Sequence, residues 1–294
     1  MADENEHHES RGQGSTHHQN SPHVAENAKS FTETALTLAD PWQQLKNFTR
    51  ARIALGRVGS SLPTKEILDF GLSHAMARDA VHLALDVIEL ENKLHAQGLV
   101  SIHVTSKAPD RASYLLRPDW GRRLSDASRA YLEQLNSRPV DFLIVVGDGL
   151  SSLAVDRHAA PLIDEIKKII PAAWRLGNIV IATQARVAIA DEIAEILNAR
   201  MVAILIGERP GLSSPDSLGI YLTLNPKTGC NDADRNCISN VRPEGLGYAA
   251  AAKKMVWLAQ EALRIGASGV LLKDESDHIE LPVFTAGLKP KPIL

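Results

Sequence analysis

The chain has 294 residues, enough for one large domain or two small ones and for a substantial buried core. Hydrophobic residues (44%) and charged residues (23%) occur at the frequencies of a globular protein. A net charge of −3 offers no bulk attraction for nucleic acid or acidic membranes, and 4% aromatic residues argues against a base-stacking surface. No apolar run is long enough to cross a bilayer. We therefore expect neither nucleic acid nor a membrane as a partner.

Residues 1–38 are polar and contain five of the eleven histidines. Such a composition cannot offset the entropy of ordering a chain, so these residues are expected to form a disordered tail. Adventitious metal binding by the histidine pairs is the alternative, without a fixed geometry behind it. The N-terminus has no apolar segment of the kind that secretory signals carry.

Residues 39–137 are expected to form a helical N-terminal domain. A short helix near Leu45 is followed by a long helical segment that begins after Pro63, with Thr64 as its N-cap, and ends at Gly98. A strand-like piece over 100–104 and further helical segments to about residue 135 follow.

Three side chains of the long helical segment, His74, Arg78 and His82, are spaced four residues apart and share one face. The arginine repels a cation, and the two histidines lie too far apart to hold one metal ion. This face is therefore either solvated or docked on a partner subunit.

From residue 140 the pattern changes to continuous apolar runs that alternate with helical segments. The runs cover 140–146, 178–183, 201–206, 220–224 and 268–272, and the helical patterns cover 156–170, 189–197 and 246–265. Apolar strands alternating with helices are typical of a parallel sheet covered on both faces. The predicted fold class is α/β: a Rossmann-like parallel-sheet domain over 138–275, preceded by the helical N-terminal domain and followed by an extended tail over 276–294.

Two loops that follow predicted strands are candidates for a ligand site. The loop 147–152 resembles a nucleotide-binding turn, but Ser152 stands at the third glycine of G-x-G-x-x-G, so the dinucleotide fingerprint fails. A tight turn and a contact with a ligand's polar group both remain open there, with Asp148 and Ser151 as candidate contacts. The loop 207–219 follows a buried strand, as ligand sites at the carboxyl end of a sheet do.

Cys230 and Cys237 are the two cysteines of the chain, and they lie in a polar segment that is expected to be a loop. One pair excludes a disulfide framework and favours a reducing, cytoplasmic location. Structural zinc needs further cysteine or histidine ligands at short spacing, so no metal site is expected. The sequence shows no Ser-His-Asp arrangement, paired carboxylates or phosphate loop. The sequence therefore indicates a protein that binds a cofactor and has no catalytic groups of its own.

Several separated segments, taken together and in order over residues 41–272, resemble the small (light) subunit family of ethanolamine ammonia-lyase. They cover 49–59, 73–82, 117–124, 148–151, 185–189, 207–219 and 235–240. The resemblance implies a lyase that splits ethanolamine into acetaldehyde and ammonia by a radical mechanism dependent on adenosylcobalamin. It also implies a hetero-oligomer in which a TIM-barrel large subunit carries the catalytic groups, while this chain helps to hold cobalamin at the subunit interface.

The family's cobalamin contacts match Val187, Glu208 and Cys237 in this chain. Asp148, Ser151 and Arg186 are further candidate contacts, chosen for their positions in loops. Val187 is interpreted as an apolar wall for the corrin or, alternatively, as core packing. Glu208 is interpreted as an acceptor for corrin amides, with an ion pair to Arg209 or Arg186 as the competing role. Cys237 is small and soft enough to approach the cofactor. The alternative function is a stand-alone Rossmann-like protein that binds a nucleotide or corrinoid.

Two further expectations depend on the resemblance. Asp156 and His158 form part of the D-x-H-x-x-G motif of cobalamin enzymes that coordinate cobalt through a protein histidine, but Pro161 replaces its glycine. The match is therefore interpreted as coincidence, with His158 on the surface and the cofactor's own base kept on cobalt. Family members that enter bacterial microcompartments can carry an amphipathic N-terminal helix, and residues 1–30 lack its apolar periodicity.

Overall fold

The computed structural model describes residues 37–277. The expected tails, 1–38 and 276–294, fall almost wholly outside the described residues. A six-stranded sheet with the strand order β1-β3-β2-β4-β5-β6 lies at the centre. The strands are β1 (Ser101–Thr105), β2 (Leu143–Gly147), β3 (Ile179–Thr183), β4 (Met201–Gly207), β5 (Leu218–Leu224) and β6 (Arg235–Val241).

The α/β fold class is confirmed, but the expectation of a wholly parallel sheet is wrong. Strands β1, β3, β2 and β4 pair in parallel, whereas β5 is antiparallel to β4 and β6 is antiparallel to β5. The reason is the connection between β4 and β5. Residues 208–217 contain no helix, and a parallel return needs a crossover that is usually helical. The chain therefore turns back on itself beside β4.

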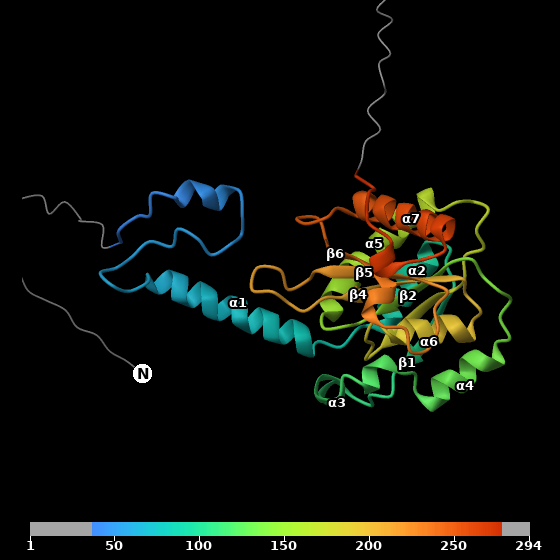
Figure 1. Cartoon of the computed structure of the whole chain (residues 1–294). Helices are drawn as coiled ribbons and strands as arrows, with labels where there is room; N and C mark the ends of the chain where they lie inside the picture. The colour runs from blue at the N-terminus through green and yellow to red at the C-terminus, as the bar shows by residue number, and fades with distance from the viewer. Residues whose placement is uncertain (1–36, 278–294) are drawn as a thin grey trace, which may run out of the picture.

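Helices cover both faces of the sheet (Figure 1). One face is covered by α2 (Val87–Ala96), α5 (Ser152–Ile169) and α7 (Tyr248–Ile265), whose apolar residues belong to the larger buried cluster. The other face is covered by α4 (Asp126–Gln134) and α6 (Ile189–Ile196), which pack in a second buried cluster. Two short elements, α3 (Arg111–Leu116) and the 3₁₀ turn Trp120–Arg122, precede α4.

A separate helical N-terminal domain is not confirmed, because its expected range contributes to the sheet and to both clusters. Strand β1 pairs with β3 along its whole length, and Leu90 and Leu94 of α2 are fully buried. The long helix expected between Thr64 and Gly98 is two helices, α1 (Thr64–His82) and α2. The helix is interrupted over residues 83–86. The Asp86 carboxylate accepts from the Glu89 N–H at 2.9 Å and so caps α2. Pro63, not Thr64, is the N-cap residue of α1.

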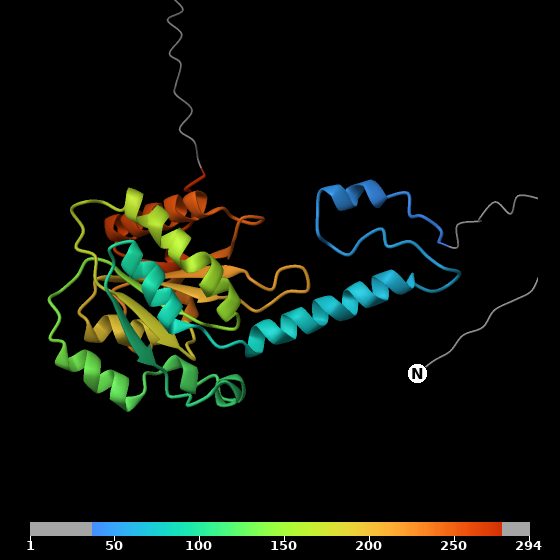
Figure 2. The ribbon, with the colours of Figure 1, turned by 180° about the vertical axis from the view of Figure 1, so that it is seen from behind.

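Residues 37–82, here called the N-terminal arm, project from the rest of the described chain (Figures 1 and 2). The arm consists of α1 and an irregular segment with a 3₁₀ turn at Gln43–Asn47. Its base is tied down where Arg111 donates to the Val81 carbonyl at 2.7 Å. Its exposed large apolar residues are Leu38, Trp42, Leu45, Phe48, Val58, Leu62, Ile67, Leu68, Phe70, Leu72 and Met76.

The C-terminal part differs from the prediction at two places. The strand expected over 268–272 is wrong, because the chain forms a 3₁₀ turn at Gly269–Leu271. Gly269 has φ +72°, and a Cβ there would lie 1.9 Å from the Ala233 carbonyl oxygen, so only glycine fits. Strand β6 was not predicted. Among residues 37–277, no helix is long and apolar enough to cross a membrane.

Candidate functional site

The loops after β2 and β4 meet at the carboxyl end of the parallel strands, where their backbones are in direct contact. A Cβ on Gly149, which has φ +57°, would lie 2.2 Å from the Gly207 carbonyl oxygen. A Cβ on Gly207 would lie 2.0 Å from the Ser151 carbonyl oxygen. Glycine is required at both positions because any side chain would force the two loops apart.

Asp148 and Ser151 are buried, and their side chains bind neighbouring loops. Asp148 accepts from the Ala185 N–H at 2.8 Å and the Gln184 N–H at 2.9 Å, and it pairs with Arg111 at 3.3 Å. Burial raises the pKa of Asp148, while the Ala185 N–H and the other donors act against that rise. These bonds fix the loop after β3. A direct contact of Asp148 with a ligand stays a prediction.

Ser151 is the N-cap of α5 and also holds the loop after β4. Its hydroxyl accepts from the Ala154 N–H at 3.2 Å and donates to the Pro215 carbonyl at 2.7 Å. The α5 helix holds the same loop a second time, because Arg157 pairs with Asp216 at 2.8 Å. Both contacts act on the loop that begins at Glu208. The contact predicted between Ser151 and a ligand stays a prediction.

Glu208 begins the loop after β4, and one of its carboxylate oxygens is already occupied. Oε2 accepts from the Ser217 hydroxyl and, at 3.3 Å, from the Asn240 N–H, which a β-bulge in β6 turns toward it. Within the described part of the chain, Oε1 has no hydrogen-bond donor and neither Arg186 nor Arg209 forms an ion pair with the carboxylate. The carboxylate is therefore held in place with one oxygen free to accept.

Arg186 and Val187 lie in the loop after β3. Val187 is half-buried and lines two cavities, so its side chain is available as an apolar wall. The Arg186 guanidinium lies 4.4 Å from the centre of the Tyr114 ring, a cation–π contact. The Arg186 Nε atom is buried and has no hydrogen-bond partner among residues 37–277. An unpaired buried donor is costly unless a ligand or partner satisfies it.

Cys237 lies on the edge strand β6, so the polar loop predicted for it is wrong. It is an exposed free thiol directly opposite Tyr221 of β5. Burial raises the pKa of Tyr221, and the adjacent Cys237 and Glu208 add to the rise. Tyr221 is not among the residues predicted from the sequence. It lies opposite Cys237 and lines the same cavity as Val187 and Glu208.

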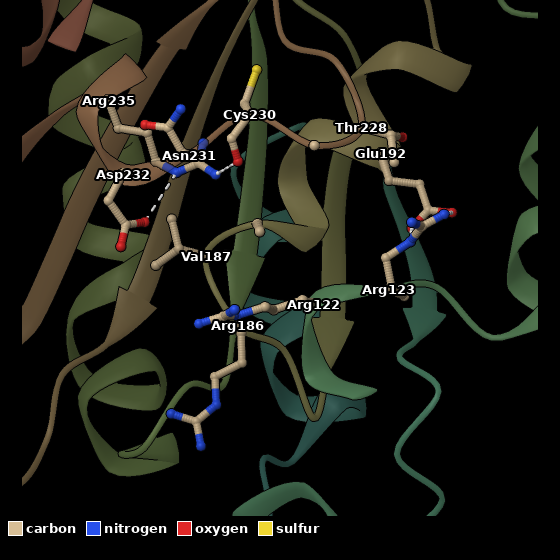
Figure 3. Close-up of a pocket in the computed structure, with 12 residues that line it drawn as sticks. Arg122, Arg123, Arg186, Val187, Glu192, Thr228, Cys230, Asn231, Asp232 and Arg235 are labelled. Carbon is tan, nitrogen blue, oxygen red and sulfur yellow. Dashed lines mark hydrogen bonds and ion pairs between the residues drawn. The ribbon is translucent and has the colours of Figure 1, made fainter. Parts of the chain in front are cut away.

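Two adjoining cavities run along this edge of the sheet and share Arg186 and Val187. The first has a volume of about 410 Å³ and is lined by Glu208, Val187 and Tyr221 among others. The second has a volume of about 470 Å³ and lies between the loop after β3 and the segment 228–235. In the view of Figure 3, Val187 lies between the Arg235 side chain and those of Arg186 and Arg122. The structure thus brings Val187, Glu208 and Arg186 together, with Cys237 beside them.

The placement predicted for His158 on the surface is wrong. The side chain is buried, with Nδ1 2.8 Å from the Tyr248 hydroxyl and Nε2 3.5 Å from the Asp216 carboxylate. It packs there because α5 turns this face toward α7. Among residues 37–277, no group of three His, Cys, Asp or Glu side chains is placed to hold a metal ion.

The known proteins to which this chain is similar share one family. The family model of the ethanolamine ammonia-lyase light chain (EutC) matches residues 39–273. The chain belongs to this family. Proteins named ethanolamine ammonia-lyase small subunit from Ralstonia nicotianae, Azotobacter vinelandii and Pseudomonas syringae pv. tomato are each 54% identical to it. The matches cover 86%, 82% and 81% of this chain and 94%, 91% and 84% of those proteins.

Proposed function

We propose that this chain is the small subunit of an adenosylcobalamin-dependent ethanolamine ammonia-lyase and helps to hold the cofactor at the interface with the large subunit. The observation that carries the proposal is the grouping of Val187 and Glu208 around one cavity, with Cys237 beside it. These residues come from three segments far apart in the sequence. The family resemblance had named the same three as cofactor contacts.

The side chains present fit a corrinoid. A corrin ring offers an apolar face and a rim of amide groups. Val187 supplies an apolar wall, and the free Oε1 of Glu208 can accept from an amide N–H. The buried, unpaired Nε of Arg186 is a donor that a polar group of the cofactor can satisfy.

When bound, the cofactor supplies a radical that starts the conversion of ethanolamine to acetaldehyde and ammonia. The role of this chain is to bind and orient the cofactor and to keep water from that side of it. Two carboxylates at or beside the second cavity are engaged in ion pairs. Glu192 pairs with Arg123 at 2.9 Å, and Asp191 pairs with Arg235 at 2.9 Å. We therefore assign the catalytic groups to the large subunit.

The N-terminal arm supports assembly with a large subunit. Its exposed apolar residues form a surface of a kind that marks protein–protein contacts. The arm also lies beside the loop that Glu208 begins. A cavity of about 490 Å³ is lined by residues 46–51 of the arm, by Ser213 of the loop after β4 and by Glu244. One partner can thus cover both. A TIM-barrel fold of that partner and a cytoplasmic location stay predictions, and any microcompartment signal in residues 1–30 lies outside the described residues.

The test is reconstitution. The chain is mixed with a cognate large subunit, adenosylcobalamin and ethanolamine, and acetaldehyde is measured. Product formation only when both chains are present is the expected result. If a large subunit that is active with another small subunit gives no product with this chain, the proposal is wrong. A stand-alone corrinoid- or nucleotide-binding protein would then be tested by titrating the isolated chain with cobalamin and with NAD.

A further inference from the structure

The second cavity, of about 470 Å³, is rich in guanidinium groups. Arg122, Arg123, Arg186 and Arg235 line it, together with the carboxylates of Glu192 and Asp232. It adjoins the cavity of Glu208 through Val187 and Arg186, which line both. A ligand seated against Val187 can therefore extend a polar group into this cavity.

Two of the four guanidinium groups are already neutralised. Arg123 pairs with the buried carboxylate of Glu192 at 2.9 Å. Arg235, which is only 2% exposed, pairs with Asp191 at 2.9 Å and lies 3.7 Å from Asp232.

The other two guanidinium groups have no carboxylate within ion-pair distance in the described part of the chain. Arg122 is exposed at the mouth of the cavity. Arg186 is held over Tyr114, and its buried Nε lacks a hydrogen-bond partner. The loop that carries Arg186 is anchored to the one that carries Arg122, because the Arg186 N–H donates to the Gly121 carbonyl at 2.7 Å. The backbone segments that carry the two arginines are thus held against each other.

We propose that Arg122 and Arg186 form a binding site for the phosphodiester of the cofactor's nucleotide tail. This inference rests on the proposed function, since it extends the site of Val187 and Glu208 by one subsite. The phosphodiester is the anionic group of cobalamin, and guanidinium groups bind phosphate oxygens through strong charge-assisted hydrogen bonds. The cobalamin then lies with its corrin against Val187 and Glu208 and its nucleotide tail in the arginine cavity.

The experiment uses the assembled complex with the large subunit and three probes: adenosylcobalamin, adenosylcobinamide phosphate and adenosylcobinamide. Cobinamide has the same corrin and cobalt but lacks the phosphate and the nucleotide. Equilibrium dissociation constants are measured for the wild type, Arg122→Gln and Arg186→Gln. Arg117→Gln is the matched control, because Arg117 pairs with Asp119 at 2.7 Å and does not line the cavity. Gel filtration checks that each complex forms.

We expect each cavity variant to bind adenosylcobalamin and adenosylcobinamide phosphate about tenfold more weakly, as the loss of one charge-assisted hydrogen bond predicts. Adenosylcobinamide should bind all variants as it binds the wild type, and the control should bind every probe normally. An equal loss for cobinamide, or no loss for any probe, would overturn the phosphodiester site. Failure of the variants to assemble would also overturn it, by showing that the arginines pair with the large subunit. If the wild-type complex binds none of the probes, it is the proposed function that fails.

Discussion

Large apolar side chains are mostly buried in the sheet-containing part of the molecule, residues 87–277, and mostly exposed in the N-terminal arm. In the former, large apolar residues fill two buried clusters on either side of the sheet. In the arm, Trp42, Phe48 and Leu68 are among many that stay exposed, Phe48 to 85%. A chain that folds alone does not gain from exposing so many apolar groups in one place.

The sheet-containing part also holds a buried ion pair that has no counterpart among the described residues of the arm. In the sheet-containing part, Asp191 and Arg235 form an ion pair in which both side chains are 2% exposed. In the arm, Glu66 pairs with Lys46 at 3.4 Å where the lysine is 35% exposed. The interior of the first region is therefore filled by its own side chains, whereas the arm is suited to a partner. Each prediction below tests one side of this difference.

The largest effect is expected for Asp191→Ala. This change leaves the buried Arg235 guanidinium without its carboxylate, and breaking a buried pair in this way costs about 3–5 kcal/mol. Burial raises the pKa of Asp191 to about 7 against the lowering effect of Arg235, so the free energy of unfolding in urea should be measured at pH 8, where the carboxylate is charged. Glu66→Ala in the arm is the control, with an expected loss below about 1 kcal/mol. Equal losses for the two variants would contradict the comparison.

A substitution in the arm is expected to change the affinity for the large subunit more than the stability of the isolated chain. Leu68→Glu places a charge on a side chain that is 67% exposed. We expect little change in the unfolding of the isolated chain and a tenfold or larger loss of affinity for the large subunit, since a buried apolar contact in an interface is worth about 2 kcal/mol. Affinity is measured by titrating the labelled large subunit with the chain.

Val270→Glu is the matched control for that experiment. Val270 is 75% exposed but lies in the 3₁₀ turn Gly269–Leu271, away from the arm. It should leave assembly as in the wild type. If both variants assemble normally, the exposed apolar surface of the arm serves another purpose.

At the candidate site, Glu208→Ala is expected to weaken binding of adenosylcobalamin to the complex about tenfold, because it removes a charged acceptor. The unfolding of the subunit should change much less. Glu208→Gln keeps an acceptor oxygen in place and should lose less affinity. An unchanged dissociation constant for Glu208→Ala would remove this residue from the site.

The elements that could be predicted from the sequence are the strands formed by continuous apolar runs. Runs such as 178–183 and 201–206 are buried on both faces and were recognised as strands β3 and β4. The loops after parallel strands open at one edge, which places Val187 and Glu208 on the same edge of the sheet, but these two residues were named as cofactor contacts by the family resemblance. Strand β6 could not be predicted from a continuous apolar run, because it is a polar edge strand in which buried and exposed residues are mixed. Cys237 was consequently placed in a loop.

Other parts of the site depend on contacts that no local pattern encodes. Tyr221 faces the cavity because β5 turns back beside β4, and that reversal is set by the loop between them. Arg122 reaches the site because the segment before α4 folds against the Arg186 backbone. His158 was misplaced because its burial depends on the packing of α5 against α7. A prediction that β5 pairs with β6 would have placed Tyr221 beside Cys237.

The smallest effect is expected for His158→Gln, and it depends on pH. Burial lowers the pKa of His158 below its usual value of 6.5, with Arg157 adding to that effect and Asp216 opposing it. As the pH falls through about 6.5 the unfolded chain takes up a proton that the folded chain does not, so the wild type loses stability on acidification. Glutamine does not titrate, and the variant should lack that part of the loss.

The measurement is the difference in the free energy of unfolding between pH 8 and pH 5.5 for the wild type and the variant. His74→Gln, on the exposed face of α1, is the control and should keep the wild-type difference. Because His158 contacts Asp216 in the loop that presents Glu208, the wild-type complex should also bind cobalamin more weakly at pH 5.5, and His158→Gln should reduce that change. If the variant and the wild type respond identically to pH in both assays, the loop is held by Arg157 and Ser151 alone.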